Sequence, residues 1–320
     1  MSLGFLLLLG VPAMVALGLW LHHLFEGERL PADLWREWRL SRVPLAELDR
    51  RWAAATDRSG IVVTLTSTPS RLPLMGPALK SLLDQTRPPA RIVLNLPDFS
   101  SREQVAYTVP EDLKTLKSLQ IRRCDDLGPG TKLIPSVLNE PPDTPLLVVD
   151  DDRIYPRWLV ARYETAMTAH PDRALTLSGW IAPPDLTDRM TTIRSNLMMR
   201  PPAPIRAPRL RHPRQVDIFQ GVMSYLVRPR FFDEKSFGDF TGEPEATRYV
   251  DDVRSSALCK AGIFVIPAPS LSFVPRAQAR RLQQSRLGLV NRRPGESHNR
   301  NNTIALKHFA ERWRIGGPKR

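Results

Sequence analysis

The stretch TPLLVVDDDRIYP, residues 144–156, joins a run of aliphatic residues to three consecutive carboxylates. The aliphatic run is short and bounded by turn residues, as in a buried strand. Asp150, Asp151 and Asp152 repel one another, and three adjacent like charges give a fold no evident stability. Because ligands of open α/β sheets bind beyond the carboxyl ends of the strands, this position indicates a binding site.

The segments around this strand alternate between strand and helix patterns, which predicts a parallel, doubly wound sheet. Before it, strands are expected at 60–68, 89–97 and 120–126, and helices at 78–86, 111–119 and 132–140. After it, a helix is expected at 158–170, strands at 173–180, 216–232 and 262–269, and a last helix at 303–313. The Pro- and Arg-rich segment 201–215 is typical of a loop outside the core.

Composition is that of a globular protein, with 42% hydrophobic residues in a chain of 320. The formal net charge of +13 favours an anionic partner: membrane lipid, a phosphorylated substrate or nucleic acid. No homeodomain, zinc-finger or RNP-like motif accompanies the basic residues, so nucleic acid is not expected as the partner. The two cysteines, Cys124 and Cys259, lack C-x-x-C spacing, which disfavours a disulfide framework or a zinc site.

The N-terminal segment from Leu3 to Phe25 contains no Asp, Glu, Lys or Arg and has about the length that crosses a bilayer. A cleaved signal peptide is the alternative, but no basic residue precedes the apolar run. Arginines follow it, so the positive-inside rule predicts a single-pass membrane protein with its folded body in the cytoplasm. The next stretch, 26–58, mixes tryptophans and arginines at helical spacings; it is expected either to lie on the membrane surface or to pack on the body.

Asp150 and Asp152 are alternate residues at a strand end, where alternate side chains share a face. Carboxylate oxygens are ligands of Mg²⁺ and Mn²⁺, which usually bind phosphate oxygens as well. The pair therefore predicts a divalent-metal site that neutralises a diphosphate leaving group. The alternative is an acidic turn that caps the following helix.

A second acidic pair, Asp251 and Asp252, opens an expected helix, whose first turn favours negative charge. Besides this structural role, one of the two could be a general base that takes a proton from an acceptor hydroxyl. The loop DLGPGTKLIP, residues 126–135, lacks P-loop spacing. Its glycines allow close backbone approach, and Lys132 could reach a phosphate or simply be solvated.

Six segments occur in one order and resemble glycosyltransferases of the GT-A fold, in the broad family-2-like group: VTLTSTPSRL, SLLDQTRPPARIVLNLP, DLGPGTKL, VVDDDRIYP, FQGVMSYLVR and YVDDVRSSAL. The resemblance covers roughly residues 60–269. It implies an α/β fold with a mostly parallel sheet flanked by helices, a nucleotide-sugar donor and a divalent metal, Mn²⁺ or Mg²⁺. The expected organisation is a transmembrane anchor at 1–25, a linker at 26–58, a catalytic domain at 59–275 and a basic helical tail at 276–320.

The resemblance also implies roles for single residues. Asp150 to Asp152 would be the D-x-D motif, with Asp152 the direct metal ligand and Asp150 near the ribose or the metal. The other donor-side residues would be Ser67, Arg71, Asp126, Lys132 and Asp151.

On the acceptor side, Gly221 after Gln220 would leave room for a sugar. Asp252, or else Asp251, would be the base of an inverting transfer. His298 would be a further metal ligand, although it lies in a polar segment where histidines are ordinarily solvated.

These expectations combine into a membrane-anchored, metal-dependent glycosyltransferase that acts on a glycan or a lipid-linked acceptor. Two other classes of protein remain as alternatives: a non-catalytic scaffold of the same fold, and a basic protein that binds nucleic acid or another anionic surface.

Overall fold

The fold is centred on one large sheet in a computed structural model that describes residues 3–284 and 300–318, with side chains described for residues 10–282 and 300–318. The sheet has eight strands in the order β10-β13-β7-β12-β6-β1-β2-β5. Their bounds are β1 (Val62–Leu65), β2 (Arg91–Leu96), β5 (Leu119–Arg123), β6 (Leu146–Val148), β7 (Arg173–Thr176), β10 (Arg214–Val216), β12 (Tyr225–Val227) and β13 (Gly262–Val265). Two smaller sheets contain β8 (Ser178–Trp180), β9 (Ile205–Arg206) and β11 (Ile218–Phe219), and β3 (Phe99–Ser100) with β4 (Val105–Ala106).

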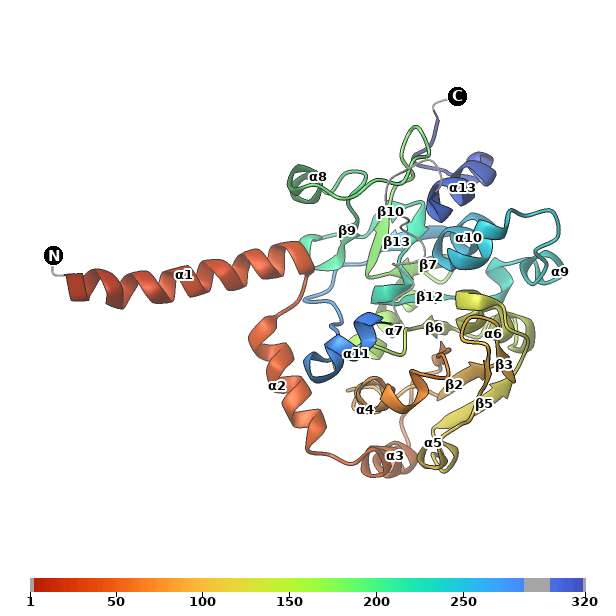
Figure 1. The fold of residues 1–320 in the computed structure, drawn as a ribbon, viewed down its shortest axis with the longest axis horizontal. Helices are drawn as coiled ribbons and strands as arrows, with labels where there is room; N and C mark the ends of the chain where they lie inside the picture. The colour runs from red at the N-terminus through yellow and green to blue at the C-terminus, as the bar shows by residue number, and fades with distance from the viewer. Residues whose placement is uncertain (1–2, 285–299, 319–320) are drawn as a thin grey trace.

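Helices flank the central sheet and connect its strands (Figure 1). They are α1 (Leu3–Glu26), α2 (Leu30–Ser41), α3 (Leu45–Ala54), α4 (Gly76–Leu83), α5 (Glu111–Lys114), α6 (Ile134–Asn139), α7 (Leu159–Ala169), α8 (Ile193–Met198), α9 (Glu234–Phe237), α10 (Asp251–Leu258), α11 (Ala279–Gln284) and α13 (Asn301–His308). Short 3₁₀ turns include η1 (Leu72–Leu74), η2 (Gly128–Lys132), η4 (Gly221–Met223) and η6 (Glu245–Tyr249).

Most strand pairs of this sheet are parallel, as the alternating pattern predicts. The neighbouring strands β6, β1, β2 and β5 are parallel to one another, and β13 is parallel to β7. Strand β12 is antiparallel to both β6 and β7, and β10 is antiparallel to β13 at the edge. The mixed α/β fold with a large, mostly parallel sheet is therefore confirmed.

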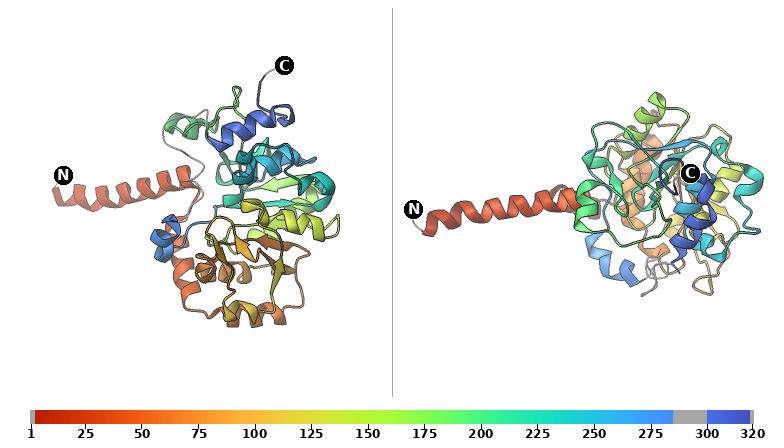
Figure 2. Two further views of the ribbon diagram at one scale, coloured as in Figure 1. Left: turned by 45° about the vertical axis from the view of Figure 1, so that its right-hand side comes forward. Right: turned by 90° about the horizontal axis from the view of Figure 1, so that it is seen from above.

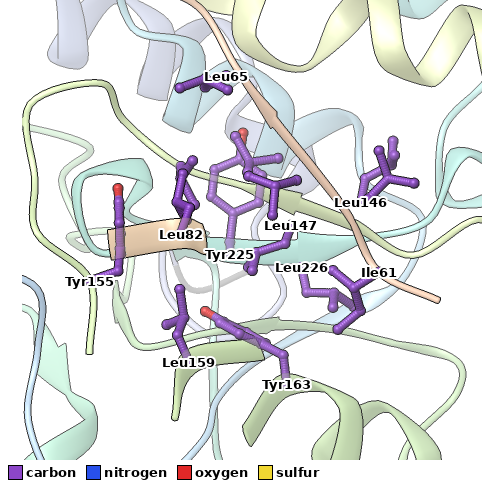
Figure 3. Packing of buried hydrophobic residues seen from close by; sticks show 14 of the residues in the cluster. Ile61, Leu65, Leu82, Leu146, Leu147, Tyr155, Leu159, Tyr163, Tyr225 and Leu226 are labelled. Carbon is purple, nitrogen blue, oxygen red and sulfur yellow. The ribbon is translucent and has the colours of Figure 1, made fainter. Parts of the chain in front are cut away.

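Both faces of the central strands are covered, which explains their unbroken aliphatic sequences. All of β1 and β6 is buried, and buried side chains between Leu40 and Phe273 form one hydrophobic cluster. Figure 3 shows part of this packing, with Leu146 and Leu147 of β6 near Leu226 of β12.

The stretch 26–58 was expected either to lie on a membrane surface or to pack on the body. Its helices α2 and α3 pack on the body. Leu40, Leu48 and Trp52 belong to the main hydrophobic cluster. The buried Arg36 guanidinium donates hydrogen bonds from Nε to the Tyr155 carbonyl oxygen at 2.7 Å and from Nη2 to the Ser81 carbonyl oxygen at 3.2 Å. These contacts anchor α2 to the loop that follows the three aspartates.

The prediction of a single-pass membrane protein is wrong: no helix in the described part of the chain is long and apolar enough to cross a bilayer. Helix α1 extends away from the body (Figures 1 and 2). The cytoplasmic orientation, which depended on the same segment, loses its basis.

Two local expectations also need correction. The helix expected at 111–119 ends after one turn, because Leu119 already pairs with Ile92 in the sheet. The segment 201–215 is not a loop outside the core: it contributes β9 and the start of β10, and Ile205 is buried.

The expected C-terminal helix is present as α13, and it packs on η6 and α10. Ala305 and Leu306 share a second buried cluster with Val250 and Val253. The C-terminal segment therefore supports the helix that opens with Asp251 and Asp252.

Candidate functional site

Five aspartates from two distant segments lie together beyond the carboxyl ends of the parallel strands. Asp150, Asp151 and Asp152 follow β6, and Asp251 and Asp252 open α10. The cationic side chains among them come from two strand-to-helix connections, Arg71 after β1 and Lys132 after β5. This is the edge where parallel α/β sheets bind ligands.

Arg71 pairs with the second and third aspartates of the strand-end triplet. Its Nη2 lies 2.6 Å from Asp151 Oδ1 and 2.7 Å from Asp152 Oδ2. Ser67 also donates a hydrogen bond from Oγ to Asp151 Oδ2. Burial raises the pKa of Asp151 to about 7; Arg71 and Ser67 oppose this rise, and the charges of Asp152 and Asp150 add to it.

Lys132 connects the strand-end triplet with the α10 pair. Its Nζ lies 3.1 Å from Asp150 Oδ1, 2.9 Å from Asp251 Oδ2 and 3.9 Å from Asp252 Oδ1. Burial alone would lower the pKa of Lys132, but the three carboxylates outweigh it and the pKa is raised. Asp150 shows the converse: burial favours its neutral form, yet Lys132 and more distant arginines hold its pKa below the usual value.

Asp252 combines a fixed orientation with an unsatisfied oxygen. Its Oδ2 accepts a hydrogen bond from the Gly221 N–H at 2.9 Å, whereas Oδ1 has no hydrogen-bond partner among the described residues. Burial, and then the charge of Asp251, raise the pKa of Asp252 to about 7, while Lys132 and the Gly221 N–H oppose the rise. A carboxylate with such a pKa can accept a proton near neutral pH.

Gly221 lies against the lysine and the aspartate. A Cβ atom at this position would be 2.6 Å from Lys132 Nζ and 2.7 Å from Asp252 Oδ1. The neighbouring Gln220 accepts a hydrogen bond from Ser178 Oγ at 2.6 Å. The space beside Gly221, expected to admit an acceptor sugar, therefore contains the Lys132–Asp252 pair.

Asp126, expected on the donor side, is not part of this cluster. Asp126 shapes its own loop: it accepts hydrogen bonds from the N–H groups of Ser101 at 2.7 Å and Gly128 at 2.9 Å. His298, expected as a metal ligand, lies outside the described residues.

The donor set suits a hard divalent cation only in part. Among the described residues, no three His, Cys, Asp or Glu side chains are arranged to hold a metal ion by themselves. Asp150 and Asp152 are two carboxylates from one loop, and Mg²⁺ is commonly held by one or two carboxylates together with substrate phosphates and water. The cluster contains five carboxylates, and the cations in direct contact with them are Arg71 and Lys132. The excess of carboxylates would favour the binding of a further positive charge.

Sequence reasoning missed the residues that hold these loops in place. The Tyr155 hydroxyl accepts the Asp150 N–H at 2.8 Å, and the Tyr107 hydroxyl donates to the Ser67 carbonyl oxygen at 3.0 Å. Arg153 is buried and donates from Nε to Ser272 Oγ at 2.8 Å. Tyr155 and Arg153 lie within the strand-end stretch itself, where a tyrosine and an arginine so close to three aspartates were a usable signal. Nothing in the sequence indicates Ser272, more than a hundred residues away.

No family model and no curated protein matches the sequence. Several solved structures are similar in fold. Residues 1–349 of TarS from S. aureus align with a TM-score of 0.42 and 11% identity over 78% of this chain and 70% of that one. The mannosyltransferase PcManGT from Pyrobaculum calidifontis, in complex with GDP-Man and Mn²⁺, aligns with a TM-score of 0.40 and 13% identity over 88% of this chain and 78% of that one.

A third similar structure is a 4-diphosphocytidyl-2C-methyl-D-erythritol synthase, with a TM-score of 0.40 and 10% identity over 71% of this chain and 98% of that one. TarS has also been solved in complex with UDP-GlcNAc. Two of the similar proteins, TarS and PcManGT, have thus been solved with a nucleotide sugar. At such TM-scores and identities, the likeness does not determine the reaction of this chain.

Proposed function

We propose that this protein is a glycosyltransferase that moves a sugar from a nucleoside-diphosphate sugar to an acceptor hydroxyl. The observation that supports this most is the meeting of two acidic groups around Lys132 at the carboxyl ends of the strands. One group follows β6, where a donor diphosphate and a cation would lie; the other opens α10, with a carboxylate that can take a proton.

On the donor side, Asp150 and Asp152 would hold a divalent cation, Mn²⁺ or Mg²⁺, which supplies positive charge to a diphosphate leaving group. Arg71 holds Asp151 and Asp152 together, so the carboxylates are oriented before any ligand arrives. Ser67 lies in the same connection after β1 as Arg71 and donates a hydrogen bond to Asp151, the second carboxylate of the triplet.

On the acceptor side, Asp252 takes the proton of the acceptor hydroxyl. The acceptor oxygen then forms a bond with the anomeric carbon of the sugar, while the bond from that carbon to the diphosphate oxygen breaks. The nucleoside diphosphate leaves with the electron pair, and a single displacement of this kind inverts the anomeric configuration.

Thermal shift measurements with a nucleotide panel test the donor side. We expect one nucleoside diphosphate to raise the melting temperature only when Mn²⁺ is present, because a ligand that binds the folded state stabilises it. Asp152→Ala should abolish this shift. Asp57→Ala, which changes an exposed aspartate paired with Arg87, is the matched control and should keep it.

Two outcomes would contradict the proposal. If no nucleoside diphosphate or nucleotide sugar shifts the melting temperature of folded protein, the non-catalytic scaffold becomes the better account. If Asp152→Ala responds like the wild type, the assignment of Asp152 is wrong.

A further inference from the structure

Helix α8 and the turn before it expose apolar side chains where an ordinary surface helix would bury them. A surface helix of a globular protein turns its apolar side chains toward the core. Here Met190, Ile193 and Leu197 are all exposed, Ile193 by 73%, and the buried residue of the helix is Ser195. Ile193 and Leu197 are four residues apart and therefore share one face of the helix. This apolar face points away from the body.

Arginine side chains attach α8 to the body. Arg209 donates a hydrogen bond from Nη2 to the Leu197 carbonyl oxygen at 2.6 Å, and Arg206 donates one from Nη1 to Asn196 Oδ1 at 3.0 Å. Leu197 and Ile193 belong to neither of the two hydrophobic clusters. The helix is therefore held in place by polar contacts, and its apolar side chains remain available to another surface.

Helix α2 shows the same inversion. Two of its buried residues, Asp33 and Arg36, are ionisable. Leu34, Trp35 and Trp38 are exposed, and the two indole rings stack with their centroids 4.7 Å apart. Because tryptophan is ordinarily well buried and ionisable residues are ordinarily exposed, this outer face also indicates a nonpolar neighbour.

Helix α1 leaves the body between α2 and α8 (Figures 1 and 2). The end of α1 lies against the segment that holds α8, since a Cβ atom at Gly27 would be 3.4 Å from Pro208 Cγ. Val15, Leu17 and Trp20 of α1 are exposed, and at 3.6 residues per turn they lie on different sides of the helix. A groove on a protein partner would cover one of these sides, whereas lipid surrounds a helix.

The charges on these helices indicate which lipid fits. Arg194 and Arg200 are exposed beside the apolar face of α8, and the Arg42 guanidinium lies 5.4 Å from the centroid of the Trp38 ring. In the described part of the chain, the one exposed carboxylate on α1, α2 and α8 is that of Glu26. Tryptophan favours the headgroup region of a bilayer, and arginine is attracted to anionic headgroups.

We propose that the outer faces of α2 and α8, on either side of α1, form a docking surface for a bilayer that contains anionic lipid. The exposed tryptophans of α2 and the apolar side chains of α8 enter the headgroup region, and the arginines beside them pair with lipid phosphates. The contact is made from one side of the bilayer and does not require a helix that crosses it. It is independent of the proposed glycosyl transfer, because it uses none of the residues assigned to that reaction.

Flotation of the full chain with lipid vesicles tests the proposal without any enzymatic activity. We expect the chain to float with vesicles of phosphatidylcholine and phosphatidylglycerol. Binding to phosphatidylcholine alone should be at least about tenfold weaker, since each arginine near an anionic surface contributes roughly fivefold. High salt should weaken the binding, because it screens these charges. No flotation of the wild type, or equal binding to both kinds of vesicle, would overturn the proposal.

Two double variants test the two faces separately. Trp35→Ser with Trp38→Ser, and Ile193→Ser with Leu197→Ser, should each weaken binding to the anionic vesicles by roughly tenfold or more, because each removes apolar area from the contact. These side chains are exposed, so the variants should keep the melting temperature of the wild type.

The matched control is Phe99→Ser with Val105→Ser, which changes two exposed apolar residues on the hairpin of β3 and β4. It should float like the wild type. If both helix variants also float like the wild type, the faces of α2 and α8 are not the docking surface. If the wild type instead forms a dimer in analytical ultracentrifugation, binds no vesicles, and becomes monomeric with Trp35→Ser and Trp38→Ser, a second copy covers these faces and the proposal is wrong.

Discussion

At the scale of single residues, the protonation of Asp252 predicts how activity depends on pH. Its pKa of about 7 means that it binds a proton in acidic solution and loses it near neutrality. We therefore expect kcat/KM for sugar transfer to rise between about pH 6 and pH 8 and then to level off. Asp252→Asn should lower kcat by roughly 10²- to 10⁴-fold and abolish this rise. A pH profile that stays flat in the wild type, or an active Asn variant, would remove Asp252 from the reaction.

The same residue predicts a gain in stability when its charge is removed. The folded pKa of about 7 lies above the ordinary value of 3.8, so the folded state binds the proton more tightly than the unfolded chain does. The wild type then loses stability as the pH rises from the ordinary pKa through the folded one. Asp252→Asn should therefore have a higher melting temperature than the wild type at pH 8, and the difference should shrink toward pH 5. Melting curves at both pH values check this, and a lower melting temperature at pH 8 would contradict it.

At the scale of elements, Asp217 ties the C-terminal segment to the sheet. Its buried carboxylate accepts hydrogen bonds from the N–H groups of Arg314, Ile315 and Gly316, each at 2.8 Å, and from that of Ala182 at 3.1 Å. Helix α13 precedes these residues and packs on α10, so this attachment also supports the helix that contains Asp252.

Asp217→Ala removes the acceptor of several N–H groups, and a hydrogen bond to a charged group contributes roughly 1.5–3 kcal/mol. We expect a loss of at least about 2 kcal/mol in the free energy of unfolding. The amides of residues 314–316 should exchange with solvent much faster than in the wild type. Asp185→Ala, at a half-exposed aspartate paired with Arg189, is the control and should behave like the wild type. Unchanged amide protection in Asp217→Ala would show that other contacts hold the C-terminal segment.

At the scale of the whole molecule, the sequence predicts the parallel half of the sheet well and the rest less well. Strands β1, β2 and β6 lie within the expected ranges, because aliphatic runs buried on both faces have few alternatives. The sequence pattern does not predict that β12 runs antiparallel between β6 and β7, because strand direction in a sheet depends on pairing between segments far apart in the chain. The Lys132–Asp252 pairing depends on that arrangement, so local pattern could not predict it. The membrane-spanning segment was inferred from an uncharged apolar run of bilayer length followed by arginines, and no described helix is long and apolar enough to cross a bilayer.

Helix α1 makes few buried contacts with the body, whereas α2 and α3 contribute residues to its core. This difference predicts the outcome of two truncations. Helix α1 extends from the body (Figure 2), and several of its apolar side chains are exposed, including Met14 and Trp20. A chain beginning at Gly27 should therefore keep the melting temperature within about 2 °C, because it loses few buried contacts.

A chain beginning at Ser59 loses the core residues Leu40, Leu48 and Trp52 together with the contacts of Arg36. Each buried large side chain contributes roughly 2–5 kcal/mol, and domains are stable by only about 5–15 kcal/mol. We expect this chain to lack a cooperative thermal transition, measured by near-ultraviolet circular dichroism with the chain from Gly27 as the matched control. If it melts cooperatively near the temperature of the longer chain, α2 and α3 form a linker separate from the body, and the packing of Trp52 and Arg36 contributes little to stability.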